Sequence, residues 1–463
     1  MAPVIGIGIG IPYNVFAGGA AFASYAENGI APKLVGDFTN SLYTKDGETS
    51  VAFSDIFTHV RSGGSAATYF DSNGYLATVA GAAPRLDAHV WDDTATAWIK
   101  GALIENASNN LVQNSRAAAS FTAADYTKTA NQSLGIDNAV SMTEFAETAT
   151  NTLHAAGSGL IPTSVTIGLP YTMSGYVKPR GASRYLQLTN SGTYFGSAQY
   201  ATFDLTSGTV VQATSCVAHI EKMGTTGIYR VGMTAVATGS GINNEIFFIG
   251  ADTAGAARAV SYLGNTANGF FIDQMQFEQS REMTSPIVTT GSALTRSIDT
   301  VTIAPANLVY PTGSPLAVSF AMDGLISYAE TGAAFLLTGT SADVLFYRWQ
   351  AGTTAFVNAG LATNNADDYF AATQNNAGVF DEVGVLFTPN PGYYRPFNIA
   401  TYHIANGQNS ARNGTANTEN TTPTVFPNLT TATMQIMQGS GHYRKFRMWD
   451  VSIENAGIES ASA

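Results

Sequence analysis

Short alternating segments separated by glycine-rich turns are the feature that most restricts how this chain can fold. Residues 171–178 place apolar and polar side chains in turn, which is the pattern of a strand with one buried face. Similar segments recur at intervals of about ten residues, and turns such as 206–208 and 224–227 separate them. This spacing predicts antiparallel sheets packed as a sandwich or jelly roll.

The expected strands fall into two blocks. The first block contains 171–178, 184–189, 200–205, 210–213, 216–221, 227–237, 244–249 and 269–278. The second contains 299–303, 316–322, 333–338, 343–348, 380–388, 395–399, 433–437 and 444–453. The polar stretch 406–424 predicts a long surface loop, 455–463 predicts a polar tail, and 115–124 shows a weak helix pattern.

We therefore expect an all-β fold in which an N-terminal anchor strand and an extended ribbon precede two antiparallel β-sandwich domains of jelly-roll type. The anchor segment comprises residues 1–50 and the turn-rich ribbon 51–120, and the sandwiches comprise 121–295 and 296–463. Within the ribbon, Asn73-Gly74 favours a tight hairpin turn, because these residues tolerate positive φ angles.

The chain carries few charges for its length, and most of them are acidic. Of 463 residues, 21 are Lys or Arg and 33 are Asp or Glu, which gives a formal net charge of −12. Charged residues make up only 12% of the chain, so polar surface must come largely from Ser, Thr, Asn and Gln. A chain this acidic is not expected to bind nucleic acid. No apolar run approaches the roughly 18 residues of a membrane span, so no membrane insertion is expected.

Cys216 is the only cysteine of the chain, which rules out a disulfide within it. It lies in a segment with a strand pattern, so we expect it to act as a small buried apolar side chain. The first residues lack the basic segment of a secretory signal peptide. These features favour release from a cell by lysis over secretion.

The opening of the chain alternates isoleucine with glycine. On a strand, Ile5, Ile7, Ile9 and Ile11 would all lie on one face, and the bare glycines would lie on the other. A glycine face lets another backbone approach closely, and an unpaired strand edge can join a neighbouring sheet. We expect these residues to anchor the chain in another subunit; an ordinary inner strand of the chain's own fold is the alternative.

No catalytic residue, cofactor or metal site is expected. The sequence lacks the motifs of nucleophilic, phosphate-binding and zinc-dependent enzymes, and its histidines are isolated from one another. Adjacent acids at Asp92-Asp93, Asp367-Asp368 and Asp381-Glu382 would point to opposite faces of a strand, which argues against a catalytic pair. A loop at Asp367-Asp368 beside two asparagines is the best candidate for calcium, with a solvated acidic loop as the alternative.

Aromatic residues next to polar side chains in the last domain are candidates for sugar binding. A sugar ring presents an apolar face and a rim of hydroxyls, so it suits an aromatic ring with nearby polar groups. The alternative is that these rings lie in the core or at a subunit interface. The candidates are Tyr347, Trp349, Tyr393, Tyr394 and Arg395.

Several short motifs occur in a fixed order along the first two thirds of the chain. Those of the ribbon are Thr68-Tyr69-Phe70-Asp71, Pro84-Arg85-Leu86-Asp87 and Leu103-Ile104-Glu105-Asn106. Those of the first sandwich and its end are residues 171–178, 203–210, Tyr229-Arg230, Gln276-Phe277-Glu278 and Thr295-Arg296-Ser297-Ile298-Asp299. In this order they resemble a group of tailed-bacteriophage structural proteins of the head spike, head fibre or tail fibre type. One position departs from that group, because Ile228 stands where a Trp usually precedes the Tyr-Arg pair.

The last part of the chain, with its closing segment 441–449, resembles concanavalin-like and laminin-G-like sandwiches. Together the resemblances imply a virion protein that docks on capsid or tail proteins by its N-terminus. They also imply a homo-oligomer, with a trimer as the first expectation, and glycan contact at the host surface. Two alternatives stay open: a capsule-polysaccharide depolymerase with carbohydrate-binding modules, and a purely architectural protein that stabilises the capsid or tail.

Overall fold

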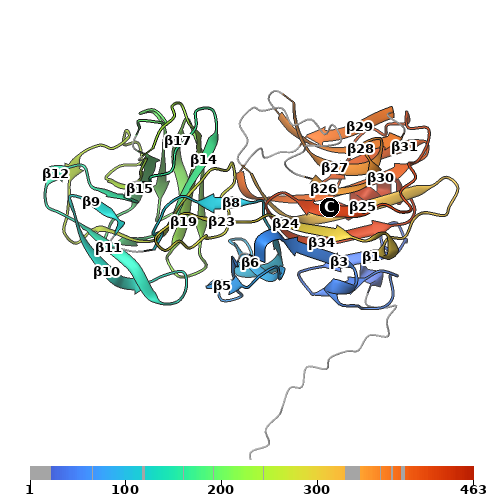
Figure 1. Cartoon of the computed structure of the whole chain (residues 1–463), viewed down its shortest axis with the longest axis horizontal. Helices are drawn as coiled ribbons and strands as arrows, with labels where there is room; N and C mark the ends of the chain where they lie inside the picture. The colour runs from blue at the N-terminus through green and yellow to red at the C-terminus, as the bar shows by residue number, and fades with distance from the viewer. Residues whose placement is uncertain are drawn as a thin grey trace, which may run out of the picture.

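The computed structural model describes residues 22–64, 66–116, 120–159, 161–190, 192–242, 244–328, 345–364, 367–376, 379–386 and 392–463. The protein is nearly all β, with 52% of residues in strands and 5% in helices, which confirms the expected fold class. Two antiparallel sandwiches lie side by side (Figure 1), and the pair β8–β23 runs between them.

The first sandwich has the strand order of a jelly roll. In its two sheets, β11-β22-β14-β19 face β13-β20-β15-β16, with further strands at the edges. One sheet consists of β10 (Tyr126–Leu134), β11 (Val140–Glu147), β22 (Gly269–Glu278), β14 (Pro170–Arg180), β19 (Tyr229–Val236) and β18 (Val217–Lys222). The other consists of β17 (Thr209–Thr214), β16 (Tyr200–Asp204), β15 (Tyr185–Asn190), β20 (Ile246–Ala251), β13 (Ala155–Gly157) and β9 (Thr122–Ala124).

The central strand β14 is buried on both faces, although its sequence predicted one buried face. Tyr171, Met173 and Val177 enter the core between the two sheets. Thr172 and Ser174, on the opposite face, are also 0% and 1% exposed. The second face is covered because segments 104–116 and 280–289 pack over it; for example, the Thr172 hydroxyl donates to the carbonyl of Ser280 at 2.9 Å.

The second sandwich is assembled from both ends of the chain. One sheet follows the order β2-β1-β34-β25-β30-β31-β32, and β7 pairs with β34 and with β6. Its bounds are β1 (Leu34–Asp37), β2 (Leu42–Thr44), β6 (Arg85–Asp92), β7 (Ala97–Ile104), β25 (Ala317–Tyr328), β30 (Gly392–Ile404), β31 (Gly407–Arg412), β32 (Thr415–Ala416) and β34 (Gly441–Trp449). The facing sheet consists of β29 (Val379–Leu386), β28 (Asp367–Asn376), β27 (Ala355–Asn364), β26 (Leu345–Gly352), β33 (Met434–Gln438), β24 (Asp299–Ile303) and β3 (Phe57–Arg61).

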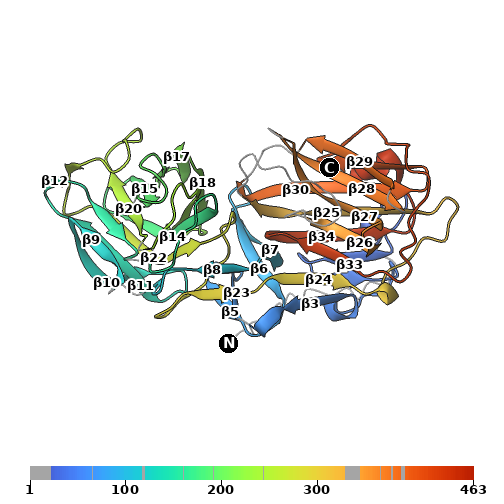
Figure 2. The same ribbon diagram turned by 45° about the horizontal axis from the view of Figure 1, so that its top comes forward.

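The described residues of the expected anchor segment, together with β3, β6 and β7 of the ribbon, therefore belong to the second sandwich, whereas residues 104–116 of the ribbon pack against the first. Strand β1 pairs along β34, with Val35 opposite Arg447, and β3 pairs along β24. Figure 2 shows these blue N-terminal strands among the orange and red C-terminal ones. The rings of Phe38, Tyr43 and Phe57 join the core of that sandwich, which explains why residues 34–61 do not stand apart. The first sandwich is thus an insertion into the second.

Smaller elements complete the fold. Strands β4 (Ala67–Phe70) and β5 (Leu76–Val79) form the expected hairpin, with Gly74 at φ 77°. Two other short pairs are β8 (Ser108–Asn110) with β23 (Leu294–Arg296), and β12 (Asn151–Thr152) with β21 (Tyr262–Leu263). Short 3-10 turns occur at Ala23–Tyr25, Phe53–Asp55, Ser62–Gly64 and Pro305–Asn307, and helix α2 spans Glu454–Ala461.

Three local expectations were wrong. The stretch 406–424 holds the fully buried strand β31 and the short β32 rather than only a surface loop, because β31 pairs along β30. The polar tail forms α2, whose Ile458 and Ala461 pack against the sheet. Within the described part of 115–124, residues 122–124 form β9 instead of a helix. No helix in the described ranges is long and apolar enough to cross a membrane.

Candidate functional site

A cluster of buried charges lies where the two sandwiches and the ribbon meet, and Asp299 is its centre. The Arg61 Nε donates to Asp299 Oδ1 at 2.9 Å, and His59 Nε2 lies 3.0 Å from the same oxygen. Arg85 Nη2 donates to Asp299 Oδ2. Asp299, Arg61 and Arg85 are 3%, 1% and 1% exposed, so this is a buried ion-pair network rather than a surface one.

Glu105 is the second acid of the cluster. Its Oε2 accepts from Arg85 Nη1 at 2.5 Å and from the Ser285 hydroxyl at 2.7 Å. Arg296 lies 3.5 Å from the same oxygen and donates to the carbonyl of Asn106 at 2.8 Å. The backbone amide of Asp299 donates to the Glu105 carbonyl and that of Glu105 donates to the Asp299 carboxylate, so the two acids are fixed relative to each other.

The surrounding cations keep both acids ionised. Burial by itself would raise the pKa of Asp299, but the hydrogen bond from His59 and the guanidinium groups of Arg85, Arg296 and Arg61 outweigh it and hold the pKa below its ordinary value. In Glu105 the same opposition between burial and the two nearest arginines leaves the pKa at about 2. The cluster therefore stays charged at neutral pH, and two carboxylates are shared among three guanidinium groups.

The partners of the cluster come from distant parts of the chain. Arg61 lies on β3, Arg85 begins β6, Glu105 follows β7, and Asp299 begins β24. Ser285 belongs to the segment that returns from the first sandwich. A charge network with contributors from so many segments fixes how they join, because losing one partner leaves the others buried and unpaired.

A polar seam continues from this cluster along the outer face of β14, β19 and β22. The Asn110 amide donates to the carbonyls of Met275 and Ile287, and Ser108 donates to Glu278 at 2.7 Å. The guanidinium of Arg230 lies over the ring of Tyr176 with 5.5 Å to its centroid. Of these residues, Glu278, Tyr176 and Arg230 belong to the short motifs noted in the sequence.

The expected sugar-binding aromatics on β26 do not face solvent. Tyr347 and Trp349 are 2% and 1% exposed and lie in the core of the second sandwich. The Tyr347 hydroxyl contacts Thr401 and His403, and Trp349 Nε1 donates to the carbonyl of Ala432 at 3.0 Å. Their placement as surface sugar-binding residues was therefore wrong, because the strand that carries them lies inside the second sandwich, where the Tyr347 hydroxyl and the Trp349 nitrogen have internal partners.

The other candidates of that set lie on β30. Tyr394 is half-buried at the junction with the first sandwich, where it packs with Met283 and its ring centroid lies 6.5 Å from that of His219. Arg395 is also half-buried. The side chain of Tyr393 lies outside the described residues, as do Ile5, Ile7, Ile9 and Ile11.

The other candidate residues that lie within the described part of the chain have ordinary structural roles. Asp92 accepts from the backbone of the turn after β6, and Asp93 accepts from Trp91 Nε1 at 2.9 Å. Cys216 is half-buried and donates to the carbonyl of Tyr200. The side chains of Asp367-Asp368 and Asp381-Glu382 lie outside the described residues. Among the residues that are described, no group of three or more His, Cys, Asp or Glu could hold a metal ion.

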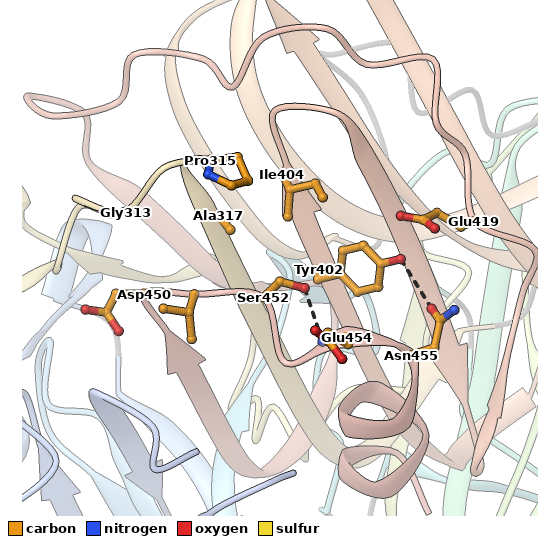
Figure 3. A pocket seen from close by; sticks show the side chains of 11 residues that line it. Gly313, Pro315, Ala317, Tyr402, Ile404, Glu419, Asp450, Ser452, Glu454 and Asn455 are labelled. Carbon is orange, nitrogen blue, oxygen red and sulfur yellow. Dashed lines mark hydrogen bonds between the residues drawn. The ribbon is translucent and has the colours of Figure 1, made fainter. Parts of the chain in front are cut away.

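A pocket of about 510 Å³ opens beside α2 on the outer side of the second sandwich (Figure 3). Apolar side chains and carboxylates both line it. The lining residues are Gly313, Pro315, Ala317, Tyr402, Ile404, Glu419, Asp450, Val451, Ser452, Glu454 and Asn455. They come from the loop before β25, from β30, from the loop after β32 and from the β34–α2 connection, so no single sequence motif could have revealed the pocket.

Tyr402 lies at the centre of this pocket wall. Its hydroxyl donates to Asn455 Oδ1 at 3.3 Å, and Asn409 Nδ2 donates to the same oxygen at 2.8 Å. Burial, and then the nearby Glu419 carboxylate, raise the pKa of Tyr402 above its ordinary value. Its hydroxyl thus stays neutral and serves as a donor, and no Lys, Arg or His is among the described residues that line the pocket.

Fold and sites together define a class: an all-β protein of two antiparallel sandwiches, with a buried charge cluster at their junction and an acidic pocket beside α2. The chain matches no protein-family model. No curated protein matches it significantly either.

Proposed function

We propose that the protein is a structural subunit of a tailed-bacteriophage virion, of the spike, fibre or decoration type, which displays its sandwiches for contact with host-surface glycans. The observation that carries this proposal is the buried cluster of Arg85, Glu105, Arg296 and Asp299. These four residues belong to the motifs on which the resemblance to phage structural proteins rests, and they pack as a single unit.

The burial of the junction supports a structural role. Its ion pairs are shielded from water and salt, and its partners come from several segments, so the sandwiches keep a fixed arrangement. In this proposal the protein binds and holds rather than converting a substrate. It also forms a homo-oligomer, whose many weak contacts with glycans add to a strong attachment.

The N-terminal segment has a separate role in the proposal. Residues Met1 to Pro12 dock on a capsid or tail protein, as the alternation of Ile and Gly predicts. This part of the proposal rests on the sequence alone.

Particle association tests the proposal. Phage particles purified by density gradient from a lysate that contains the protein should carry it, and immunogold labelling should place it at a regular position on the particle. A variant that lacks residues 1–12 should fold but stay in the soluble fraction. Recovery of the full-length protein only in the soluble fraction would refute a virion role.

The acidic pocket gives a reason to test the depolymerase alternative directly. Carboxylates that line a sugar-sized cavity can hydrolyse glycosidic bonds as well as bind sugars. Purified protein should therefore be incubated with host capsule, and reducing ends should be measured over time. The proposed binding role predicts no release, whereas release that is lost in Glu419→Gln or Glu454→Gln would establish the enzyme.

A further inference from the structure

The pocket beside α2 has the size and the lining of a site for a small ligand. Its volume of about 510 Å³ falls within the range of roughly 300–1,000 Å³ that is typical of ligand pockets. Four separate chain segments form its walls (Figure 3), so its shape depends on the folded second sandwich rather than on one loop.

One wall of the pocket is apolar. Pro315, Ala317 and Ile404 line it from the start of β25 and from the end of β30. Such a wall can contact the carbon–hydrogen face of a sugar ring while the hydroxyls point away from it. A ligand without an apolar face would leave this surface poorly covered.

The opposite side of the pocket offers hydrogen-bonding groups. Asn455 accepts from Tyr402 and Asn409 through Oδ1, which leaves its amide nitrogen to donate to a ligand. The carboxylates of Glu419 and Glu454 can accept from hydroxyl or ammonium groups. Donor and acceptors therefore surround a cavity with one apolar wall, which is the arrangement that a sugar requires.

The negative charge of the pocket lining restricts the class of ligand further. Glu419, Asp450 and Glu454 all line the pocket, and no basic side chain is among its described lining residues. A uronic or sialic acid would bring a negative charge towards carboxylates, whereas a protonated amino group would be attracted to them. We propose that the pocket binds a single sugar residue without negative charge and that it prefers an amino sugar. This inference rests on the proposed glycan contact and identifies its site and ligand class.

Saturation-transfer NMR with three free monosaccharides tests the inference. The full-length protein should transfer saturation to glucosamine and to glucose at millimolar concentrations and low salt, but not to glucuronate. We expect glucosamine to bind about threefold more tightly than glucose, because a partly exposed ion pair contributes little. Raising the salt concentration should remove most of that preference.

Two sets of variants locate the binding. The double variant Glu419→Gln and Glu454→Gln keeps the pocket volume, so glucose should bind as before while the preference for glucosamine disappears. Glu48→Gln removes an exposed carboxylate outside the pocket, so it should change neither the affinity for glucose nor the preference for glucosamine. Thermal unfolding of each variant checks that the fold is retained.

Two results would overturn the inference: no saturation transfer to glucose or glucosamine, or the same preference for glucosamine in the double variant as in the wild type. Particle association separates this failure from failure of the proposed function. A protein that is found on particles but binds no sugar in the pocket would refute only the inference. A protein that binds glucosamine yet never joins a particle would refute only the virion role.

Discussion

At the scale of single residues, Asp299 has the largest structural role, because three arginines and one histidine lie around its carboxylate. Asp299→Asn keeps the shape of the side chain but removes its charge and turns an amide group towards Arg85 or Arg61. We expect a loss of about 3–5 kcal/mol in the free energy of unfolding, as when one partner of a buried ion pair is removed. Urea denaturation followed by tryptophan fluorescence measures it. The control Asp93→Asn, an exposed acid paired with Lys222, should cost less than about 1 kcal/mol, and equal losses in both would contradict the role of Asp299.

Glu282 is a residue whose charge works against the fold near neutral pH. It accepts from Asn106 Nδ2 at 2.7 Å and from the Ser440 hydroxyl, yet burial raises its pKa from 4.5 to about 7. Between about pH 4.5 and 7 this carboxyl therefore binds a proton more tightly in the folded protein than in the unfolded chain, so its own contribution to stability falls as the pH rises through this window.

Glu282→Gln should reduce this pH dependence. The amide can still accept from Asn106, and it does not ionise. We expect the variant to gain up to about 3 kcal/mol relative to wild type between pH 5 and pH 8. Unfolding curves at several pH values in this range check it. Burial also raises the pKa of Glu221 to about 7, whereas it lowers the pKa of His403 and His442 and so adds stability as the pH rises. The difference between variant and wild type therefore isolates the contribution of Glu282. A gain over wild type that does not grow between pH 5 and pH 8 would contradict the expectation.

At the scale of elements, strands with their own strong pattern could be predicted from the sequence. Strands β22 (Gly269–Glu278) and β24 (Asp299–Ile303) have the predicted bounds, and β14 extends its prediction by one or two residues at each end. Their apolar positions alternate and glycine or polar turns bound them, so local chemistry determines where they begin and end.

Elements whose burial depends on partners far along the chain could not be predicted in the same way. Strand β31 (Gly407–Arg412) is polar but fully buried, because β30 pairs along it and α2 packs near it. Thr172 and Ser174 of β14 are buried by segments that come from outside the strand's own sheet. A polar side chain gives no local sign that another part of the chain will cover it.

The same limit applies to the sites. The motif residues Arg85, Glu105, Arg296 and Asp299 could be noticed in the sequence, but their convergence needs the pairing of β3 with β24 and of β7 with β34. The pocket residues follow no motif at all. The prediction that Tyr347 and Trp349 bind sugar at the surface was wrong, because a strand near the centre of a sandwich can bury both of its faces.

At the scale of the whole molecule, the second sandwich is discontinuous in sequence. Strands β1, β3 and β7 come from the first quarter of the chain and pair with β34 and β24 from its second half (Figure 1). The first sandwich contains all its own sheet strands, together with the β8 and β23 segments that cover it. The two sandwiches should therefore differ in their ability to fold alone.

Separate fragments test this difference. Fragment 104–299 should be soluble and unfold cooperatively, because it keeps the first sandwich, its core and the polar seam. Fragment 296–463 should be insoluble or lack dispersed amide signals in NMR spectra, because it leaves the apolar faces of β34 and β24 without Phe38, Tyr43 and Phe57. Supplying residues 22–116 as a second chain should restore solubility by completing both sheets. Cooperative unfolding of 296–463 by itself would contradict this expectation, because it would mean that the second sandwich folds without the N-terminal strands. The junction around Asp299 would then have to form after both sandwiches had folded.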